Sequence, residues 1–234
     1  MLLKRYLRAD AGIKTLADMR FRIGRIHEAN DPSEFVADYR TQGQPLPDGL
    51  VKFLTGHVRG SHTTKMGMLC FSGAEVTNQL MWGHYADGGR GVCFEVESDL
   101  LGFEPNVLFP VNYASPPRIE VSDLLDARPE NRENRERLMM EVLKTKSHVW
   151  KYEDEQRAFL ELKGEATLDP CTKAVSFYAG INPAAIRAIY LGAASEDKTI
   201  FAISDLTRHH RLKVELKIMS LSAPTGLLAA RPIA

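Results

Sequence analysis

The sequence has few cysteines and no long apolar run. Its 234 residues include three cysteines, Cys70, Cys93 and Cys171, an odd number without a C-x-x-C spacing. That pattern argues against a disulfide framework and against a structural zinc cluster. No stretch approaches the roughly 20 uninterrupted apolar residues that a membrane helix needs, so we expect no membrane span. Residues 1–5 break their apolar run at once and do not resemble a signal peptide, which favours a reducing, cytoplasmic setting.

Net charge is absent as well. Thirty basic residues balance thirty acidic ones, so attraction of the whole molecule to nucleic acid or to an anionic membrane is not the default expectation. The charge is nevertheless uneven, because the first 25 residues hold seven cations against Asp10 and Asp18. These cations are Lys4, Arg5, Arg8, Lys14, Arg20, Arg22 and Arg25. The segment suits a phosphate or pyrophosphate ligand, or it forms a solvated basic face, and the sequence leaves both open.

The pattern of apolar residues predicts a single α+β domain over residues 1–234. Strands and helices mix without regular alternation, which favours a mixed, mostly antiparallel sheet with flanking helices. We expect strands at 2–7, 20–25, 66–72, 91–97, 107–113, 156–162, 173–178, 186–192 and 212–219. We expect helices at 10–19, 78–86, 129–149 and 195–207, with Asp10 and Ser195 as N-caps and a further helix opening at Pro32. The strand 91–97 is expected to pair with 66–72.

Residues 40–65 have the composition of an irregular segment. Glycines and prolines surround one short helix candidate at 50–54. Long loops in compact domains are often lids or binding loops. We therefore expect this segment to be a loop or lid insertion.

Familiar catalytic signatures are also missing: there is no phosphate loop, G-x-S-x-G, H-E-x-x-H or G-x-G-x-x-G. Two clusters remain, and the first is Met81-Trp82-Gly83-His84-Tyr85-Ala86-Asp87. It places the polar rings of His84 and Tyr85 at a helix end beside a Gly-Gly turn through which a ligand could approach. Trp82 and Tyr85, at i,i+3, suit either the core or a stacking platform. His84 and Asp87 lack a third metal ligand, so no metal is expected.

The second cluster is Trp150-Lys151-Tyr152-Glu153-Asp154-Glu155-Gln156-Arg157. If residues 153–157 are extended, Glu153, Glu155 and Arg157 project from one face. Two carboxylates so close together repel each other, and such a pair persists when a cation neutralises it or when a site uses the charge. Two interpretations stay open. One is a salt bridge from Arg157, and the other is a carboxylate that holds a sugar hydroxyl or stabilises an oxocarbenium-like transition state.

These blocks, together with Leu3-Lys4-Arg5-Tyr6 near the start and Ile186-x-x-Ile189-x-Leu191-Gly192 late in the chain, resemble the bacterial domain of unknown function 2971 family. The resemblance covers nearly the whole chain. The most specific parts are the Met-Trp-x-His-Tyr-Ala-Asp and Trp-x-Tyr-Glu-x-Glu-x-Arg blocks. The family usually opens with Lys-aromatic-Arg, whereas this chain has Lys4-Arg5-Tyr6. Which of these side chains faces the site is therefore left open.

The family's layout is similar to that of ADP-ribosyltransferase-like proteins, which implies a split sheet and NAD as co-substrate. The implied catalytic residues are Glu155 and Glu153. The implied ligand-binding residues are Lys4, Arg5, Tyr6, Ser72, Trp82, His84, Tyr85 and Arg157. In this scheme the basic segment takes the pyrophosphate, and an aromatic ring stacks on nicotinamide.

Three functions are compatible with these residues. The first is an NAD-using glycosyl-transfer enzyme, a toxin or defence effector that cleaves the nicotinamide–ribose bond. The second is a non-catalytic module that binds a nucleotide, a nucleic acid or a protein. The third is a metal-dependent hydrolase or nuclease built on His84, Asp87, Glu153 and Glu155. The sequence indicates a small nucleotide partner and no membrane, and it leaves nucleic acid, the acceptor and the oligomeric state open.

Overall fold

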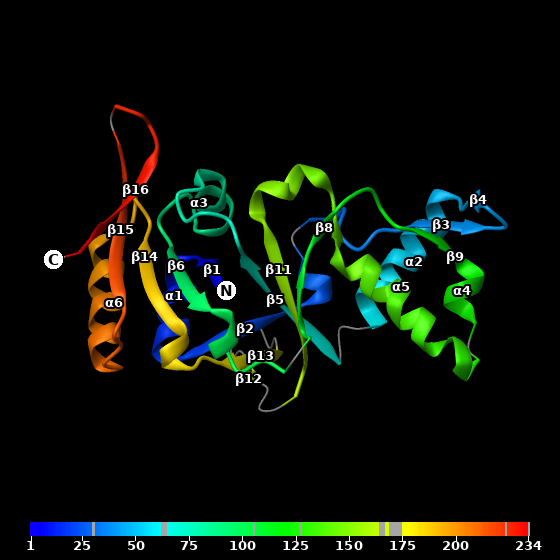
Figure 1. The fold of residues 1–234 in the computed structure, drawn as a ribbon, viewed down its shortest axis with the longest axis horizontal. Coiled ribbons are helices and arrows are strands. Elements are labelled where there is room, and N and C mark those ends of the chain that lie inside the picture. Colours follow the sequence, from blue (N-terminus) through cyan, green and yellow to red (C-terminus); the bar gives the residue numbers. More distant parts are fainter. Residues whose placement is uncertain are drawn as a thin grey trace.

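The computed structural model describes residues 1–29, 31–61, 65–104, 106–126, 128–163, 167–168, 175–222 and 224–233. These residues form an α+β structure built on one large, mostly antiparallel sheet (Figure 1), as the sequence predicts. The helices are α1 (Ala9–Asp18), α2 (Asp48–Ser61), α3 (Gln79–Tyr85), α4 (Val121–Leu125), α5 (Arg132–Lys144) and α6 (Asp197–His209). None of the described helices is long and apolar enough to cross a membrane.

The large sheet has 11 strands, nine of them in the order β12-β13-β2-β5-β1-β6-β14-β15-β16. Their bounds are β1 (Leu2–Leu7), β2 (Arg20–Arg25), β5 (Met66–Ser72), β6 (Val92–Glu97), β12 (Thr167–Leu168), β13 (Val175–Gly180), β14 (Ile186–Leu191), β15 (Glu215–Leu221) and β16 (Leu228–Pro232). The other two, β11 (Glu155–Glu161) and β7 (Leu108–Pro110), extend from β5. Among the described strands of this large sheet, β14 and β15 are the one neighbouring pair that runs parallel.

The sheet is split between β1 and β2. β11 pairs with β5 along its whole length, from Met66 to Ser72, and so occupies one edge of that strand. β1 and β2 share the other edge, because Lys4 pairs with Ser72 and Gly24 pairs with Met68. Between these two contacts, no strand of the described residues neighbours the backbone of β5 on this side. The split provides the opening along which the site lies.

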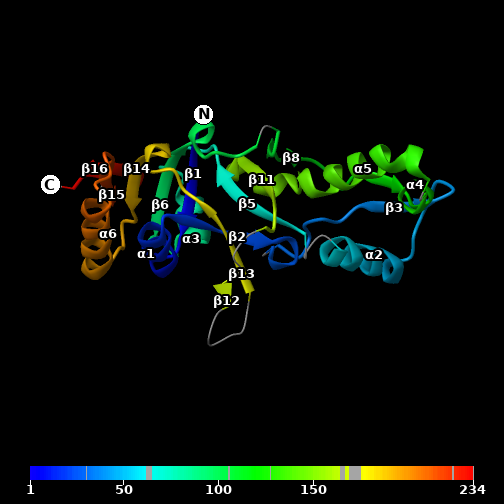
Figure 2. The same cartoon turned by 90° about the horizontal axis from the view of Figure 1, so that it is seen from below.

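Apolar side chains hold helices on both faces of this sheet. Leu16 of α1 and Ile203 of α6 are buried against Phe94 of β6 in the largest core cluster. On the other face, Met81 and Trp82 of α3 join the cluster that contains Tyr6 of β1. Figure 2 shows the helices and the sheet from a second direction.

A second group of elements extends the molecule away from the split. β3 (Asp38–Thr41), β4 (Gln44–Pro45) and β9 (Arg118–Glu120) form a small sheet, next to α2, α4 and α5 (Figures 1 and 2). Its own core contains Tyr39, Ile119 and Leu138, with Val58 of α2 buried among them. The segment 40–65, expected as a loop with a helix at 50–54, is thus a short hairpin followed by a helix of 14 residues up to Ser61. Residues 62–64 lie outside the described residues. The role of the segment as a lid stays a prediction.

Other local expectations need correction. β6 pairs with β1 and β14, because β1 lies between it and β5, so the expected pairing of 91–97 with 66–72 is wrong. The expected strand 107–113 breaks at Val111 into β7 and β8 (Asn112–Tyr113), which pair with different neighbours. The expected helix 129–149 is a 3-10 turn at Pro129–Asn131 followed by α5. It ends at Lys144 because β10 (Thr145–Lys146) turns away to pair with β8.

The two predicted N-caps are also wrong. α1 begins at Ala9, with Arg8 at its N-cap, so Asp10 lies inside the first turn, where a carboxylate is still favourable to the helix dipole. Ser195 lies before the cap of α6, and its hydroxyl donates to the carbonyl oxygens of Arg90 and Gly91 instead. At Pro32 the chain makes turns in place of the expected helix. β16 was not predicted, and Lys173 of the expected strand 173–178 lies outside the described residues.

Candidate functional site

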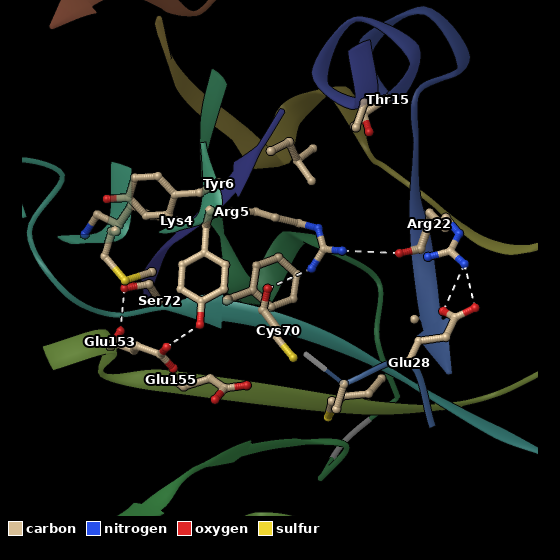
Figure 3. Close-up of a pocket in the computed structure, with 18 of the residues that line it drawn as sticks. Lys4, Arg5, Tyr6, Thr15, Arg22, Glu28, Cys70, Ser72, Glu153 and Glu155 are labelled. Carbon is tan, nitrogen blue, oxygen red and sulfur yellow. Dashed lines mark hydrogen bonds and ion pairs between the residues drawn. The ribbon is translucent and has the colours of Figure 1, made fainter. Parts of the chain in front are cut away.

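A cavity of about 460 Å³ lies along the split between β1 and β2. Side chains from both strands, from α1 and α3, and from β5, β10, β11 and β13 line it. Figure 3 shows Glu153 and Glu155 on one side of this space, Arg22 and Glu28 on the other, and Arg5 between them. The cavity therefore brings together the basic N-terminal segment and the late pair of glutamates.

Arg5 fills the gap that the split leaves in the sheet. Its Nη1 donates to the carbonyl oxygen of Cys70 at 2.7 Å, and its Nη2 donates to the carbonyl oxygen of Arg22 at 3.2 Å. The guanidinium carbon lies 5.3 Å and 5.6 Å from the ring centres of Phe21 and Phe71. Burial lowers the pKa of this guanidinium, and its Nε has no hydrogen-bond partner. Carbonyl dipoles thus hold Arg5 in place, and no carboxylate of the described residues pairs with it.

Other cations of the N-terminal segment line the same cavity. Arg20 pairs with Asp18 at 3.0 Å, and Arg22 binds both oxygens of Glu28. Two further lining cations, Lys14 and Arg25, have no carboxylate within 4.0 Å among the described residues. Together with Arg5 they leave three positive charges without an acidic partner along this wall. Such a wall suits an anionic ligand.

The opposite side of the cavity is a buried ion network. Glu153 and Glu155 both accept from Lys146 Nζ, at 2.6 Å and 3.1 Å. Arg157 donates to both oxygens of Glu155, from Nε at 2.8 Å and from Nη2 at 2.9 Å. A third carboxylate, Glu34, lies 3.0 Å from Lys146 and 2.9 Å from Arg157. Because these five side chains are at most 6% exposed, water contributes little to their solvation.

Hydrogen bonds from neighbouring elements fix the two glutamates. Glu153 ends the 3-10 helix His148–Glu153, and Asp154 follows with a positive φ of 44° before β11 begins. The Ser72 hydroxyl donates to the Glu153 carbonyl at 2.5 Å, and the Tyr85 hydroxyl donates to the Glu153 carboxylate. The Glu155 amide donates to the Tyr113 hydroxyl at 2.7 Å. Residues 153–157 are therefore not all extended, but the side chains of Glu153, Glu155 and Arg157 still meet.

The two glutamates differ in acidity. Burial opposes ionisation of Glu155, but Arg157 and Lys146 outweigh it and lower the pKa of its carboxyl to about 2. Burial also opposes ionisation of Glu153, where it outweighs the attraction of Lys146 and raises the pKa of the carboxyl. Three carboxylates and two cations leave one excess negative charge when all five groups are ionised. Of the two neighbouring glutamates, Glu153 is the one whose ionisation the fold disfavours.

Seven of the residues implied by the resemblance line the cavity: Lys4, Arg5, Tyr6, Ser72, Tyr85, Glu153 and Glu155. Trp82 does not, because its indole is buried, donates to the Val76 carbonyl at 2.6 Å and packs edge-on against Tyr6. His84 is exposed on α3, beside Trp150 at the surface. Arg157 is completely buried behind Glu155. The roles given to these ten residues stay predictions.

Sequence reasoning gave no role to Lys146, Glu34 or Tyr178, which also line the cavity. Lys146 is the cation that the crowded glutamates required, and it precedes the Trp-x-Tyr-Glu-x-Glu-x-Arg block by four residues. Glu34 is far away along the chain, so no local pattern connects it to Arg157. Among the described residues no group of three or more His, Cys, Asp and Glu side chains is arranged to hold a metal ion. Lys146 and Arg157 instead supply the positive charge between the carboxylates.

Comparison with known proteins supports the family over the central part of the chain. Residues 81–158 match the family of proteins of unknown function DUF2971. This segment begins at the Met81 block and contains the Trp150 block, so it confirms the resemblance where the two most specific motifs lie. No curated protein and no solved structure is significantly similar to the chain. The likeness to ADP-ribosyltransferase-like proteins stays a prediction.

Proposed function

We propose that the cavity binds NAD and that Glu153 assists cleavage of its nicotinamide–ribose bond. One observation carries the proposal: on one side the cavity has cations without acidic partners among the described residues, and on the other a buried glutamate that Lys146 and Tyr85 hold in place. Arg5, Lys14 and Arg25 suit the pyrophosphate, because phosphate oxygens accept charge-assisted hydrogen bonds. A ribose would lie beside the carboxylate, to which Tyr85 donates, and Ser72 lines the same cavity.

The chemistry needs a fixed carboxylate more than it needs an acid. When the bond between ribose C1′ and the nicotinamide nitrogen breaks, the electron pair stays with nicotinamide and the ribose carbon becomes positive. An ionised Glu153 stabilises that charge more in the transition state than in the bound substrate. Lys146 and Tyr85 hold its two oxygens and so limit its movement. Water or another acceptor then forms the new bond to C1′ and gives up a proton.

This assignment gives Glu155 a supporting role. Both of its oxygens accept from Arg157, and Lys146 donates to one of them as well. A carboxylate held in this way maintains the network rather than meeting a ligand. Glu153 has one guanidinium fewer around it and lies nearer to Ser72 and Tyr85. We therefore place the main catalytic role at Glu153.

A binding module without turnover is the alternative that one observation favours. Tyr85 and Lys146 already satisfy both oxygens of Glu153, which suits a structural carboxylate equally well. In that case NAD or ADP-ribose would bind along the wall that contains Arg5, Lys14 and Arg25, and it would remain intact. The two functions differ in a single product, nicotinamide.

The test combines ligand binding with product analysis. The purified chain is mixed with NAD, ADP-ribose or nicotinamide, its melting temperature is measured, and nicotinamide release is followed by chromatography. A ligand that binds only the folded state raises the melting temperature. We expect NAD to raise it and nicotinamide to accumulate. Stabilisation without nicotinamide would favour the binding module, and no stabilisation by NAD or ADP-ribose would refute both functions.

Two variants and a control test which residues bind NAD and which assist bond cleavage. Glu153→Gln is expected to keep NAD-dependent stabilisation and to lose at least about 100-fold in turnover, as removal of one electrostatic stabiliser does in other enzymes. Arg5→Ala should weaken the stabilisation by NAD. Glu161→Gln is the matched control, since Glu161 is exposed on the same strand as Glu155 and forms a surface ion pair with Lys163. It should leave both properties unchanged.

A further inference from the structure

A stacked pair of side chains lies in the cavity wall away from Glu153. The guanidinium carbon of Arg20 is 4.0 Å from the ring centre of Tyr178, which is a stacking distance. Both residues line the cavity. Tyr178 on β13 is the cross-strand partner of Arg22 on β2, and Figure 3 shows Arg22 on the side opposite the glutamates. We call Arg20 and Tyr178 the stacking pair.

Asp18 adds a hydrogen-bond acceptor beside this pair. Its Oδ2 accepts from Nε and Nη2 of Arg20, at 3.2 Å and 3.0 Å. Its Oδ1 has no hydrogen-bond donor among the described residues, and Asp18 lines the cavity. This oxygen can therefore accept from a ligand. The two hydrogen bonds from Arg20 hold the carboxylate in place.

The distance from the stacking pair to the glutamates suits a ligand that consists of several connected groups. From β11 to β13 the cavity crosses three strand intervals, β11 to β5, β5 to β2 and β2 to β13. At about 4.8 Å each these amount to about 14 Å, and the split widens the middle one. Arg5 lies between the two ends, because its guanidinium donates to the carbonyl oxygens of Cys70 on β5 and Arg22 on β2. The order along the cavity is thus acceptor and stack, Arg5, carboxylate.

We propose that the stacking pair and Asp18 bind the base of the nucleotide, and that this base is a 6-aminopurine such as adenine. The inference rests on the proposed function, because it places the other end of the same ligand. A purine ring stacks on guanidinium and aromatic groups whatever its substituents. The substituent at position 6 of the purine decides whether the edge of the ring can bind Asp18 Oδ1. The amino group of adenine donates to Asp18 Oδ1, whereas the 6-oxo group of hypoxanthine presents an oxygen to it and is repelled.

Binding of ADP, IDP and inorganic pyrophosphate to the purified chain, measured by calorimetry, tests the assignment. We expect ADP to bind at least about tenfold more tightly than pyrophosphate, since stacking on an aromatic group contributes about that factor or more. We also expect ADP to bind more tightly than IDP. Tyr178→Leu should bring the affinity for ADP close to that for pyrophosphate. Phe201→Leu is the control, because Phe201 is exposed on α6 and does not line the cavity.

Asp18→Asn gives the sharpest readout. The asparagine oxygen can still accept from Arg20, and the amide nitrogen then replaces Oδ1 and donates. The variant should therefore lose affinity for ADP and gain affinity for IDP, so that the preference between the two is reversed. A variant that merely disturbed the fold would weaken both, and its circular dichroism spectrum would show it.

Each outcome decides one question. Equal affinities for ADP and pyrophosphate would refute the base site while the phosphate site stands. Tighter binding of IDP or GDP than of ADP would refute the choice of a 6-aminopurine. No binding of ADP or pyrophosphate would refute this inference together with the proposed function.

Discussion

Replacing the two neighbouring glutamates one at a time should have very different effects on stability. Glu155→Gln removes a carboxylate that Arg157 and Lys146 hold in the ionised form. Its pKa falls from 4.5 to about 2, which corresponds to about 3 kcal/mol of folding free energy at neutral pH. Loss of one partner of a buried ion pair costs a similar amount, about 3 to 5 kcal/mol. The new glutamine amide would also place an N–H donor against Lys146 and Arg157, whose side chains can only donate hydrogen bonds.

Glu153→Gln should cost much less. Burial raises the pKa of Glu153, so its ionised form is less stable in the folded protein than in the unfolded chain. Substitution by an amide removes that penalty and leaves Lys146 and Arg157 balanced by Glu34 and Glu155. At pH 8 we expect the free energy of unfolding of Glu153→Gln to lie within about 1 kcal/mol of the parent, or above it.

The sign of the pH dependence separates the two effects. A lowered pKa stabilises the fold above the unfolded value, so the contribution of Glu155 is complete above pH 4.5 and declines as the pH falls toward about 2. A raised pKa acts in the opposite direction, so the penalty at Glu153 disappears as the pH falls below the raised value toward 4.5.

Urea unfolding at pH 8 and pH 5, followed by tryptophan fluorescence, measures these differences. Glu161→Gln, on the exposed end of β11, controls for the loss of a glutamate from the same strand. If Glu155→Gln unfolds at the same urea concentration as the parent, the network does not stabilise the fold as described. Equal destabilisation by both substitutions would contradict the assignment of different acidities to the two carboxyls.

Two further predictions concern packing. Burial raises the pKa of the Cys93 thiol well above the ordinary value, and Cys93 is fully buried, so it should not react with a maleimide at pH 7 until the protein is unfolded; rapid labelling of Cys93 in the folded chain would contradict its burial. Gly192→Ala should destabilise the fold by about 3 kcal/mol, because its Cβ would lie 2.0 Å from the carbonyl oxygen of Gly89. The control Gly56→Ala, on α2 where a Cβ meets open space, should instead stabilise by about 0.5 to 1 kcal/mol in thermal unfolding, and a loss there would mean that helix propensity does not govern this position.

Local pattern was a good guide to individual elements. The alternation of apolar residues located β1 at 2–7 and β5 at 66–72 with the bounds that the structure has. It failed where a long-range contact competes with local propensity. The helix predicted over 129–149 stops at Lys144, because the next two residues pair with β8 and turn Lys146 into the buried network. No property of residues 145–149 alone indicates that partner.

Some features of the candidate site could likewise be predicted from the sequence, and others could not. The crowding of Glu153 and Glu155, visible in the sequence, indicated a neutralising cation or a functional charge, and the structure supplies the cation as Lys146. The identity of that cation and the third carboxylate, Glu34, depend on chain segments that meet only in the fold. The basic segment predicted an anionic ligand or a solvated face. Its position on a cavity wall depends on the split between β1 and β2.

The sequence by itself determined the class of the fold, most of its strands and helices, and the residue types available for chemistry, because periodicity and composition are local properties. The tertiary structure decided which strands are neighbours, where the sheet opens, and which of two neighbouring glutamates has the higher pKa. Those depend on burial and on charges brought together from distant parts of the chain. A pKa reflects all of these groups at once, and so it emerges only when the chain is folded.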